Sequence, residues 1–102
     1  MMALQTFAAI IGPIRMAAHE LGYAIAVHGS LRRDIDLVAI PWTKDAASKE
    51  ALLSALCDRV GGIPEPDGWR PRPHGRFAHI VRVPGQNPQT YIDLSVMDVR
   101  QS

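Results

Sequence analysis

The chain has 102 residues, 47% of them apolar, and its eleven basic and ten acidic side chains give a formal net charge of +1. This length suits a single domain, residues 1–102, with a hydrophobic core that needs neither a disulfide nor a structural metal. The near-neutral charge excludes a wholly basic nucleic-acid binder of the histone type and an acidic tail protein, so any electrostatic function has to be local. The only cysteine, Cys57, cannot form an internal disulfide.

The N-terminal part of the chain is apolar, and no charged side chain precedes Arg15. It differs from an export signal because no Lys or Arg precedes the apolar stretch and no clear small-residue cleavage site follows it. Arg15, His19 and Glu20 also interrupt the stretch too early for a membrane span. We therefore expect a soluble cytoplasmic protein that does not associate with a membrane.

The predicted elements follow in chain order. Apolar residues at helical spacing predict a helix over residues 4–21, which Pro13 either kinks or begins. Two short apolar runs, 23–27 and 35–40, are typical of strands buried on both faces. Helical periodicity returns over 43–60, where Thr43 or Asp45 is the expected cap. Two more strands are predicted over 77–83 and 91–97, joined by a hairpin loop at 84–88.

The order helix, strand, strand, helix, strand, strand predicts an α+β fold in which a mixed sheet of about four strands packs on two helices. The remaining segment, residues 61–76, holds four of the eight glycines and four of the eight prolines. Loops of this length without secondary structure are uncommon in small domains and are usually functional or disordered. This one carries Arg70, Arg72 and Arg76, and no acidic residue lies between Gly68 and Ile92.

The residues with the clearest chemistry are three aspartates. Asp34 and Asp36 are two positions apart, so we expect their side chains on the same face of the strand over 35–40. Neighbouring carboxylates repel each other, and a hard divalent cation such as Mg²⁺ relieves that repulsion with oxygen ligands of this kind. Asp93 adds a third carboxylate if the strand over 91–97 lies beside the strand over 35–40.

A short turn precedes the first two aspartates. Gly29 lets the backbone approach a ligand closely, and the hydroxyl and amide of Ser30 suit phosphate oxygens. Arg32 and Arg33 follow, where they bind phosphate or, in an alternative interpretation, form ion pairs with the aspartates. A zinc site is not expected, because the four histidines do not share metal-ligand spacing with a cysteine pair.

Three motifs together resemble the nucleotidyltransferase superfamily, which includes DNA polymerase beta and the minimal bacterial nucleotidyltransferases. They are Gly29-Ser30 after a strand, Asp34-Ile35-Asp36 opening the next strand, and Asp93 within Tyr91-Ile92-Asp93-Leu94-Ser95. The resemblance implies a minimal single-domain form of that fold, in which the Gly-Ser turn holds the nucleotide's phosphates and the three acids hold two Mg²⁺ ions. It also implies that Asp93 helps to activate the attacking hydroxyl. The chain further resembles short uncharacterised phage and prophage proteins, which implies no activity by itself.

The activity that the resemblance implies is transfer of a nucleoside monophosphate from a nucleoside triphosphate to an unknown hydroxyl acceptor. Arg70, Arg72 and Arg76 are candidates to neutralise the triphosphate. The turn is shorter than the family pattern, because only residues 31–33 separate Ser30 from Asp34. A catalytically degenerate member that binds a phosphate-bearing ligand, nucleic acid or protein is therefore the alternative. A short chain with an open sheet edge also makes a homodimer or a partner protein plausible.

Overall fold

The structure is a computed structural model that describes residues 2–86 and 89–97. The elements are, in chain order, α1 (Met2–Glu20), β1 (Tyr23–His28), β2 (Ile35–Pro41), α2 (Lys49–Val60), β3 (Ile63–Pro64), β4 (Arg70–Arg72), the 3-10 turn η1 (Pro73–Gly75), β5 (Arg76–Val83) and β6 (Thr90–Met97). The predicted order of two helices and four main strands is confirmed. The two short strands β3 and β4 lie inside the segment that was expected to be an irregular loop.

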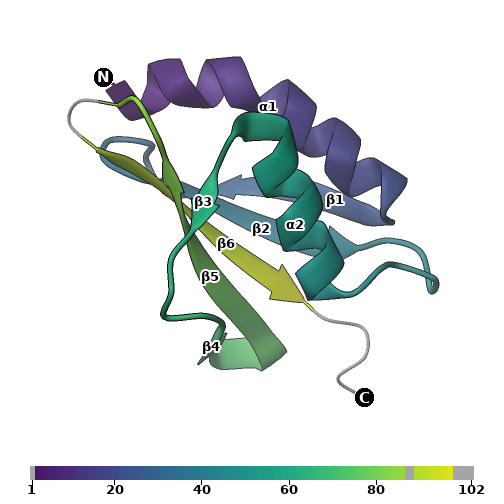
Figure 1. Ribbon diagram of the computed structural model, residues 1–102. Coiled ribbons are helices and arrows are strands. Elements are labelled where there is room, and N and C mark those ends of the chain that lie inside the picture. The colour runs from purple at the N-terminus through teal and green to yellow at the C-terminus, as the bar shows by residue number, and fades with distance from the viewer. Residues whose placement is uncertain (1, 87–88, 98–102) are drawn as a thin grey trace.

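All six strands belong to one mixed sheet (Figure 1). Strand β6 lies parallel to β2 on one side and antiparallel to β5 on the other. Strand β1 continues the sheet beyond β2, and β3 and β4 both pair with β5. The predicted α+β fold with a mixed sheet is therefore confirmed. Within the described part of the chain, no helix is both long and apolar enough to cross a membrane.

Both helices pack on the same face of the sheet, and the core lies between the helices and that face (Figure 1). Strand alternation decides which residues reach this core: Ile35, Leu37 and Ala39 of β2 are buried, whereas Asp36 and Val38 between them are half-buried. The prediction of strands buried on both faces is wrong, because the helices cover only one. The opposite face, which carries Asp36, is free to hold polar side chains.

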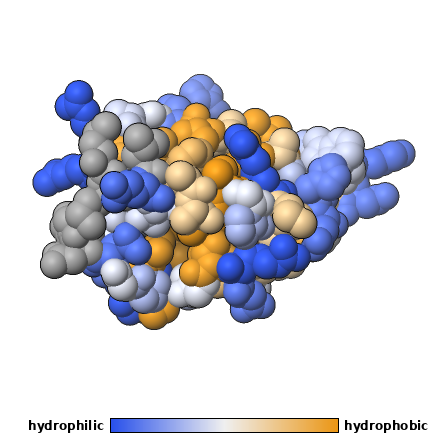
Figure 2. Space-filling model, turned by 90° about the horizontal axis from the view of Figure 1, so that it is seen from above, coloured by the Kyte–Doolittle hydropathy of each residue, from blue (hydrophilic) through white to orange (hydrophobic). Residues whose placement is uncertain are grey.

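Helix α1 continues through Pro13, so the helix does not begin there. Ile14, Ala17 and Ala18 face the core, and Met16 is 62% exposed. Seen from the side of α1, apolar side chains gather over the middle of the surface and hydrophilic ones lie at both ends (Figure 2). The helical layer is thus apolar at its centre, and Asp36 lies on the other side of the sheet.

Helix α2 begins later than predicted because its cap is Ser48 and not Thr43 or Asp45. The Ser48 Oγ accepts a hydrogen bond from the Ala51 N–H at 3.2 Å, which satisfies one of the free donors of the first turn. The helix ends where Gly61 adopts a left-handed conformation with φ of 66°.

The segment 61–76 is attached to the rest of the fold through Trp69. Its ring packs against the core and meets the His79 ring edge-on, with centroids 5.1 Å apart. The Lys49 ammonium lies 5.5 Å from the Trp69 centroid. Trp69 therefore anchors its own segment to the domain, and this anchor lies next to β4.

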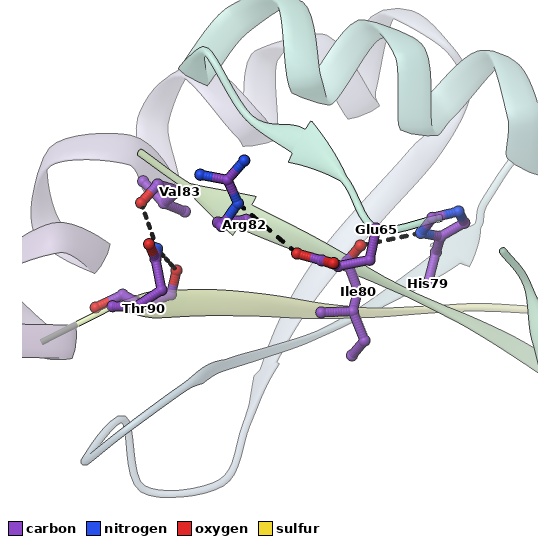
Figure 3. A network of polar contacts seen from close by, with 7 residues as sticks. Glu65, His79, Ile80, Arg82, Val83 and Thr90 are labelled. Carbon is purple, nitrogen blue, oxygen red and sulfur yellow. Dashed lines mark hydrogen bonds and ion pairs between the residues drawn. The ribbon is translucent and has the colours of Figure 1, made fainter. Parts of the chain in front are cut away.

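A second attachment fixes the beginning of the segment. The Glu65 N–H donates to the carbonyl oxygen of Ile80 at 2.9 Å, and its carboxylate lies 3.8 Å from the Arg82 guanidinium (Figure 3). Both partners belong to β5. The residues between Glu65 and Arg72 therefore run beside the sheet and bring β4 to the edge of β5, with which it pairs.

Candidate functional site: a pair of aspartates on the open face of the sheet

Asp36 and Asp93 lie side by side on the two parallel strands. The register of β2 and β6 places Asp36 next to Asp93 and Leu37 next to Leu94. Leu37 and Leu94 are buried under the helices, so alternation directs both aspartates to the open face. The expectation that the last strand lies beside the strand of the first acids is confirmed.

The two carboxylates line a pocket of about 230 Å³, which we call the acid pocket. Its polar side chains come from five different strands, so the pocket forms only when these strands are assembled in the sheet. They are His28 of β1, Asp36 of β2, Arg72 of β4, Arg76 of β5, and Asp93 and Ser95 of β6. Two acids, two arginines and a histidine thus meet around one small volume.

Only one of the two carboxylate oxygens of Asp93 has a hydrogen-bond partner among the described residues. Its Oδ2 accepts from the Arg72 Nη2 at 3.4 Å, which is long for a charge-assisted hydrogen bond. Its Oδ1 is buried, and it has no hydrogen-bond partner among the residues that the structure describes. An unsatisfied buried carboxylate oxygen is costly, so it points to a ligand that completes the site.

The environment of Asp36 disfavours its charge. Partial burial raises the pKa of the Asp36 carboxyl, and the negative charges of Asp93 and Asp34 raise it further. His28 and Arg72 act in the opposite direction with smaller effects. Around the Asp36 carboxyl itself, burial and the two neighbouring acids outweigh His28 and Arg72, although the two acids and two arginines that line the pocket balance each other in formal charge.

The turn before β2 brings Gly29 against the Asp36 carboxylate. Gly29 has a φ of 81°, and a Cβ atom added to it would lie 2.8 Å from the Asp36 Oδ2. Only glycine combines this conformation with such a close approach. Leu31 also has a positive φ, of 59°, and packs against the core, which holds the turn in place.

The other residues predicted in this turn lie further out. Ser30, Arg32, Arg33 and Asp34 are exposed, and none of the four lines the acid pocket as the structure describes it. The Asp34 charge still reaches the pocket, since it contributes to the raised pKa of Asp36. The sequence suggested all three aspartates as one group, whereas the structure brings together Asp36 and Asp93 and leaves Asp34 at the rim.

The predicted arginines of the 61–76 segment divide in the same way. Arg72 and Arg76 line the acid pocket. The Arg76 Nε donates to the carbonyl oxygen of Pro73 at 3.2 Å, which leaves its terminal nitrogens for a ligand. Arg70 instead forms an ion pair with Asp67 at 2.8 Å and lines a neighbouring pocket.

The donor set can be tested against a metal ion. In residues 2–86 and 89–97, no group of three or more His, Cys, Asp or Glu side chains is arranged to hold one. Mg²⁺ nevertheless often binds proteins through one or two carboxylates and completes its coordination with water and substrate phosphates. The unsatisfied Asp93 Oδ1 and the adjacent Asp36 carboxylate fit this mode of binding.

Sequence reasoning did not include two residues of the acid pocket, His28 and Ser95. His28 pairs directly with Asp36 across the antiparallel strands β1 and β2. Ser95 lies two positions after Asp93 on the same face of β6. Strand alternation alone could have found Ser95, whereas His28 required the pairing register of the first two strands.

A larger hollow of about 590 Å³ lies between α1 and β1, away from the aspartates. Its lining includes one acid, Glu20, which is already paired with Arg59 at 3.1 Å. Exposed Met16 and half-buried Ile25 give this hollow an apolar character. Its ionisable lining residues, Arg15, His19 and Glu20, all come from α1, whereas the acid pocket gathers ionisable side chains from five strands. The smaller acid pocket is therefore the better candidate for chemistry.

Comparison with known proteins supports the fold. A crystal structure of the Cid1 poly(U) polymerase with Mg and 3'-dATP bound is similar to this chain with a TM-score of 0.53 and 13% sequence identity. The match covers 91% of this chain and 30% of the polymerase, so the chain spans less than a third of that protein. No family model matches the sequence, and no curated protein matches it either. The chain thus has a nucleotidyltransferase-like fold.

Proposed function

We propose that the protein is a Mg²⁺-dependent nucleotidyltransferase, which transfers a nucleoside monophosphate from a nucleoside triphosphate to a hydroxyl acceptor. The observation that carries the proposal is the pairing of Asp36 with Asp93 beside an unsatisfied buried oxygen of Asp93. The similarity in fold to a polymerase solved with Mg and a nucleotide supports it. The proposal is consistent with the arginines that line the same pocket.

The pocket residues have separable roles in this proposal. Arg72 and Arg76 bind the triphosphate, because a guanidinium pairs bidentately with phosphate oxygens. The Asp93 Oδ1 has a free lone pair with which to accept the proton of the attacking hydroxyl. Gly29 keeps the Asp36 carboxylate accessible, since any side chain at that position would press on it. The reaction would form a phosphodiester bond at the α-phosphate and release pyrophosphate.

Asp36 and Asp93 are the residues that would hold the metal. Asp34, at the rim, is near enough to affect the charge of Asp36 and is the third ligand that we propose. When bound, one or two Mg²⁺ ions would stabilise the negative charge that develops on the attacking and leaving oxygens. The exposed turn with Ser30, Arg32 and Arg33 would then contact the outer phosphates.

A second function has an observation of its own. Arg72 already lies against Asp93, where it supplies the positive charge that a metal ion would otherwise supply. A catalytically degenerate protein that binds a phosphate-bearing ligand through arginines alone fits this contact. The two functions differ in one measurable property, because only the enzyme needs a divalent cation to bind the nucleotide.

Isothermal titration of Mg²⁺ and of each nucleoside triphosphate into the native protein, Asp36→Asn and Asp93→Asn tests the proposal. We expect both variants to lose at least about tenfold in Mg²⁺ affinity, because a contact with a charged group contributes about 1.5–3 kcal/mol. Pyrophosphate release should occur with the native protein only. The alternative function is favoured if the native protein binds nucleotide equally well with EDTA.

The matched control is Glu65→Gln. Glu65 is a half-buried acid, with 33% of its side chain exposed against 28% for Asp93, and it also pairs with an arginine (Figure 3). It does not line the acid pocket. This variant should bind Mg²⁺ as the native protein does, and a loss equal to that of Asp93→Asn would contradict the proposed site.

A further inference from the structure

Arg72 is held weakly at the acid pocket. Its contact with Asp93 is 3.4 Å long, and the two side chains are 44% and 28% exposed. Ion pairs with this exposure contribute little to stability and are easily exchanged. Arg72 also lines the neighbouring pocket that contains Arg70 and Asp67, so its side chain lies between two polar hollows.

The backbone that carries Arg72 is a peripheral element. Strand β4 has three residues, all of them exposed, and it pairs only with β5 within the described chain. Pro71 and Pro73 flank Arg72, and neither has an N–H to donate to a neighbouring strand. Asp93, by contrast, belongs to a strand that is paired on both sides. The arginine can therefore move while the aspartate stays fixed.

A divalent cation at the Asp93 Oδ1 and the Arg72 guanidinium at the Oδ2 would share one carboxylate, so the two cations compete for its negative charge. A bound triphosphate changes this balance, because it offers the arginine several oxygens in bidentate geometry. Arg76, which pairs with Arg72 in the β4–β5 register, lines the same pocket and increases the positive charge there. Repulsion between like charges also favours an anion at this point.

We propose that Arg72 is an exchangeable cation, which pairs with Asp93 in the free protein and with the triphosphate in the metal–nucleotide complex. The inference rests on the proposed function and adds a second state for Arg72, which that function already assigns to the triphosphate. If Arg72 exchanges in this way, its removal should strengthen metal binding and weaken triphosphate binding. A purely structural role for Arg72 would weaken both affinities together.

The test is isothermal titration of Mg²⁺ alone, and then of inorganic tripolyphosphate in the presence of Mg²⁺, with native protein and Arg72→Gln. Removal of the competing charge should tighten Mg²⁺ binding by about threefold, the effect of a surface ion pair. Loss of the guanidinium should weaken tripolyphosphate binding by at least about tenfold. Tripolyphosphate is the probe because it has no nucleobase or sugar, so its binding reports contacts to phosphate alone.

Arg72→Lys and Arg82→Gln make the experiment specific. Lysine keeps the charge without the bidentate geometry, so Arg72→Lys should bind Mg²⁺ like the native protein and tripolyphosphate with intermediate affinity. Arg82 belongs to β5, forms an ion pair with Glu65 and does not line the acid pocket. Arg82→Gln should therefore change neither the affinity for Mg²⁺ nor that for tripolyphosphate. Thermal melts show whether each variant is folded.

The outcomes separate this inference from the proposed function. If the native protein binds Mg²⁺ but Arg72→Gln binds Mg²⁺ no more tightly, or binds tripolyphosphate unchanged, the exchange is refuted and the metal site stands. If neither protein binds Mg²⁺, the proposed function fails and the exchange fails with it.

Discussion

The carboxylates of Asp36 and Asp93 share one face of the sheet on adjacent parallel strands, although most of the chain separates them in sequence. Such a pair is unfavourable in the free protein because the charges repel each other and Asp36 is partly buried. An unfavourable arrangement of charges in the free protein is typical of functional sites, where a bound ligand stabilises it.

The first prediction concerns the stability of Asp36→Asn without metal. Because the pKa of Asp36 is raised in the folded protein, the folded state binds more protons than the unfolded chain at pH values just above 3.8. The free energy of unfolding therefore falls as the pH rises through this window, and the loss persists at neutral pH. Asp36→Asn should remove it and raise the free energy of unfolding at neutral pH by less than about 1 kcal/mol, or the melting temperature by up to about 4 °C.

Melting curves in EDTA at several pH values check this prediction. Well below pH 3.8 the carboxyl is protonated in both states, so the native protein and Asp36→Asn should melt alike. A variant that melts lower than the native protein at neutral pH would show that the Asp36 charge is stabilising and would contradict our account.

The second prediction concerns Gly29→Ala, with Gly85→Ala as its control. Both glycines have a left-handed conformation, with φ of 81° and 83°, so either substitution should cost about 1–2 kcal/mol of stability. Only at Gly29 would the new methyl group approach the Asp36 carboxylate, whereas nothing described lies within 4 Å of a Cβ at Gly85. Gly29→Ala should therefore also weaken Mg²⁺ binding, and Gly85→Ala should not. Equal Mg²⁺ affinities in the two variants would argue against close approach of this turn to the site.

The third prediction compares the two tryptophans. Trp69 packs against the core, His79 and Lys49, whereas Trp42 is 58% exposed and stacks on the His19 ring with centroids 5.2 Å apart. Trp69→Ala should lower the free energy of unfolding by about 2–3 kcal/mol, somewhat less than a fully buried tryptophan, and Trp42→Ala by less than about 1 kcal/mol. Denaturant unfolding measures both values. Amide exchange at Arg70 and Arg72 should accelerate only in Trp69→Ala, because Trp69 anchors the segment that carries β4.

Much of the fold could be predicted from the sequence because alternation and helical periodicity are local signals. They located both helices and the four main strands, and Asp93 could be placed on the polar side of its strand before its neighbour was known. The start of α2 was predicted wrongly because Thr43, Asp45 and Ser48 are all acceptable caps, and only the tertiary fold decides among them.

The candidate site was harder to predict because its residues meet through sheet pairing. His28 was missed since its position opposite Asp36 depends on the register of β1 and β2. Arg72 and Arg70 are equivalent in sequence, yet one contacts Asp93 and the other Asp67. No periodicity distinguishes them, because two residues that are two positions apart on β4 lie on the same face of the strand.

The position of β6 has a consequence for how the protein matures. Of the described strands it is the last in the chain, yet it lies between β2 and β5 and completes the pairing of both. Until it enters the sheet, β2 and β5 each have an unpaired edge, and Asp36 has no partner carboxylate. Long-range pairing of this kind is slow to form. Acquisition of the acid pair is therefore coupled to the long-range pairing of β6 with β2, and a chain in which these two strands have not paired does not have the two aspartates side by side.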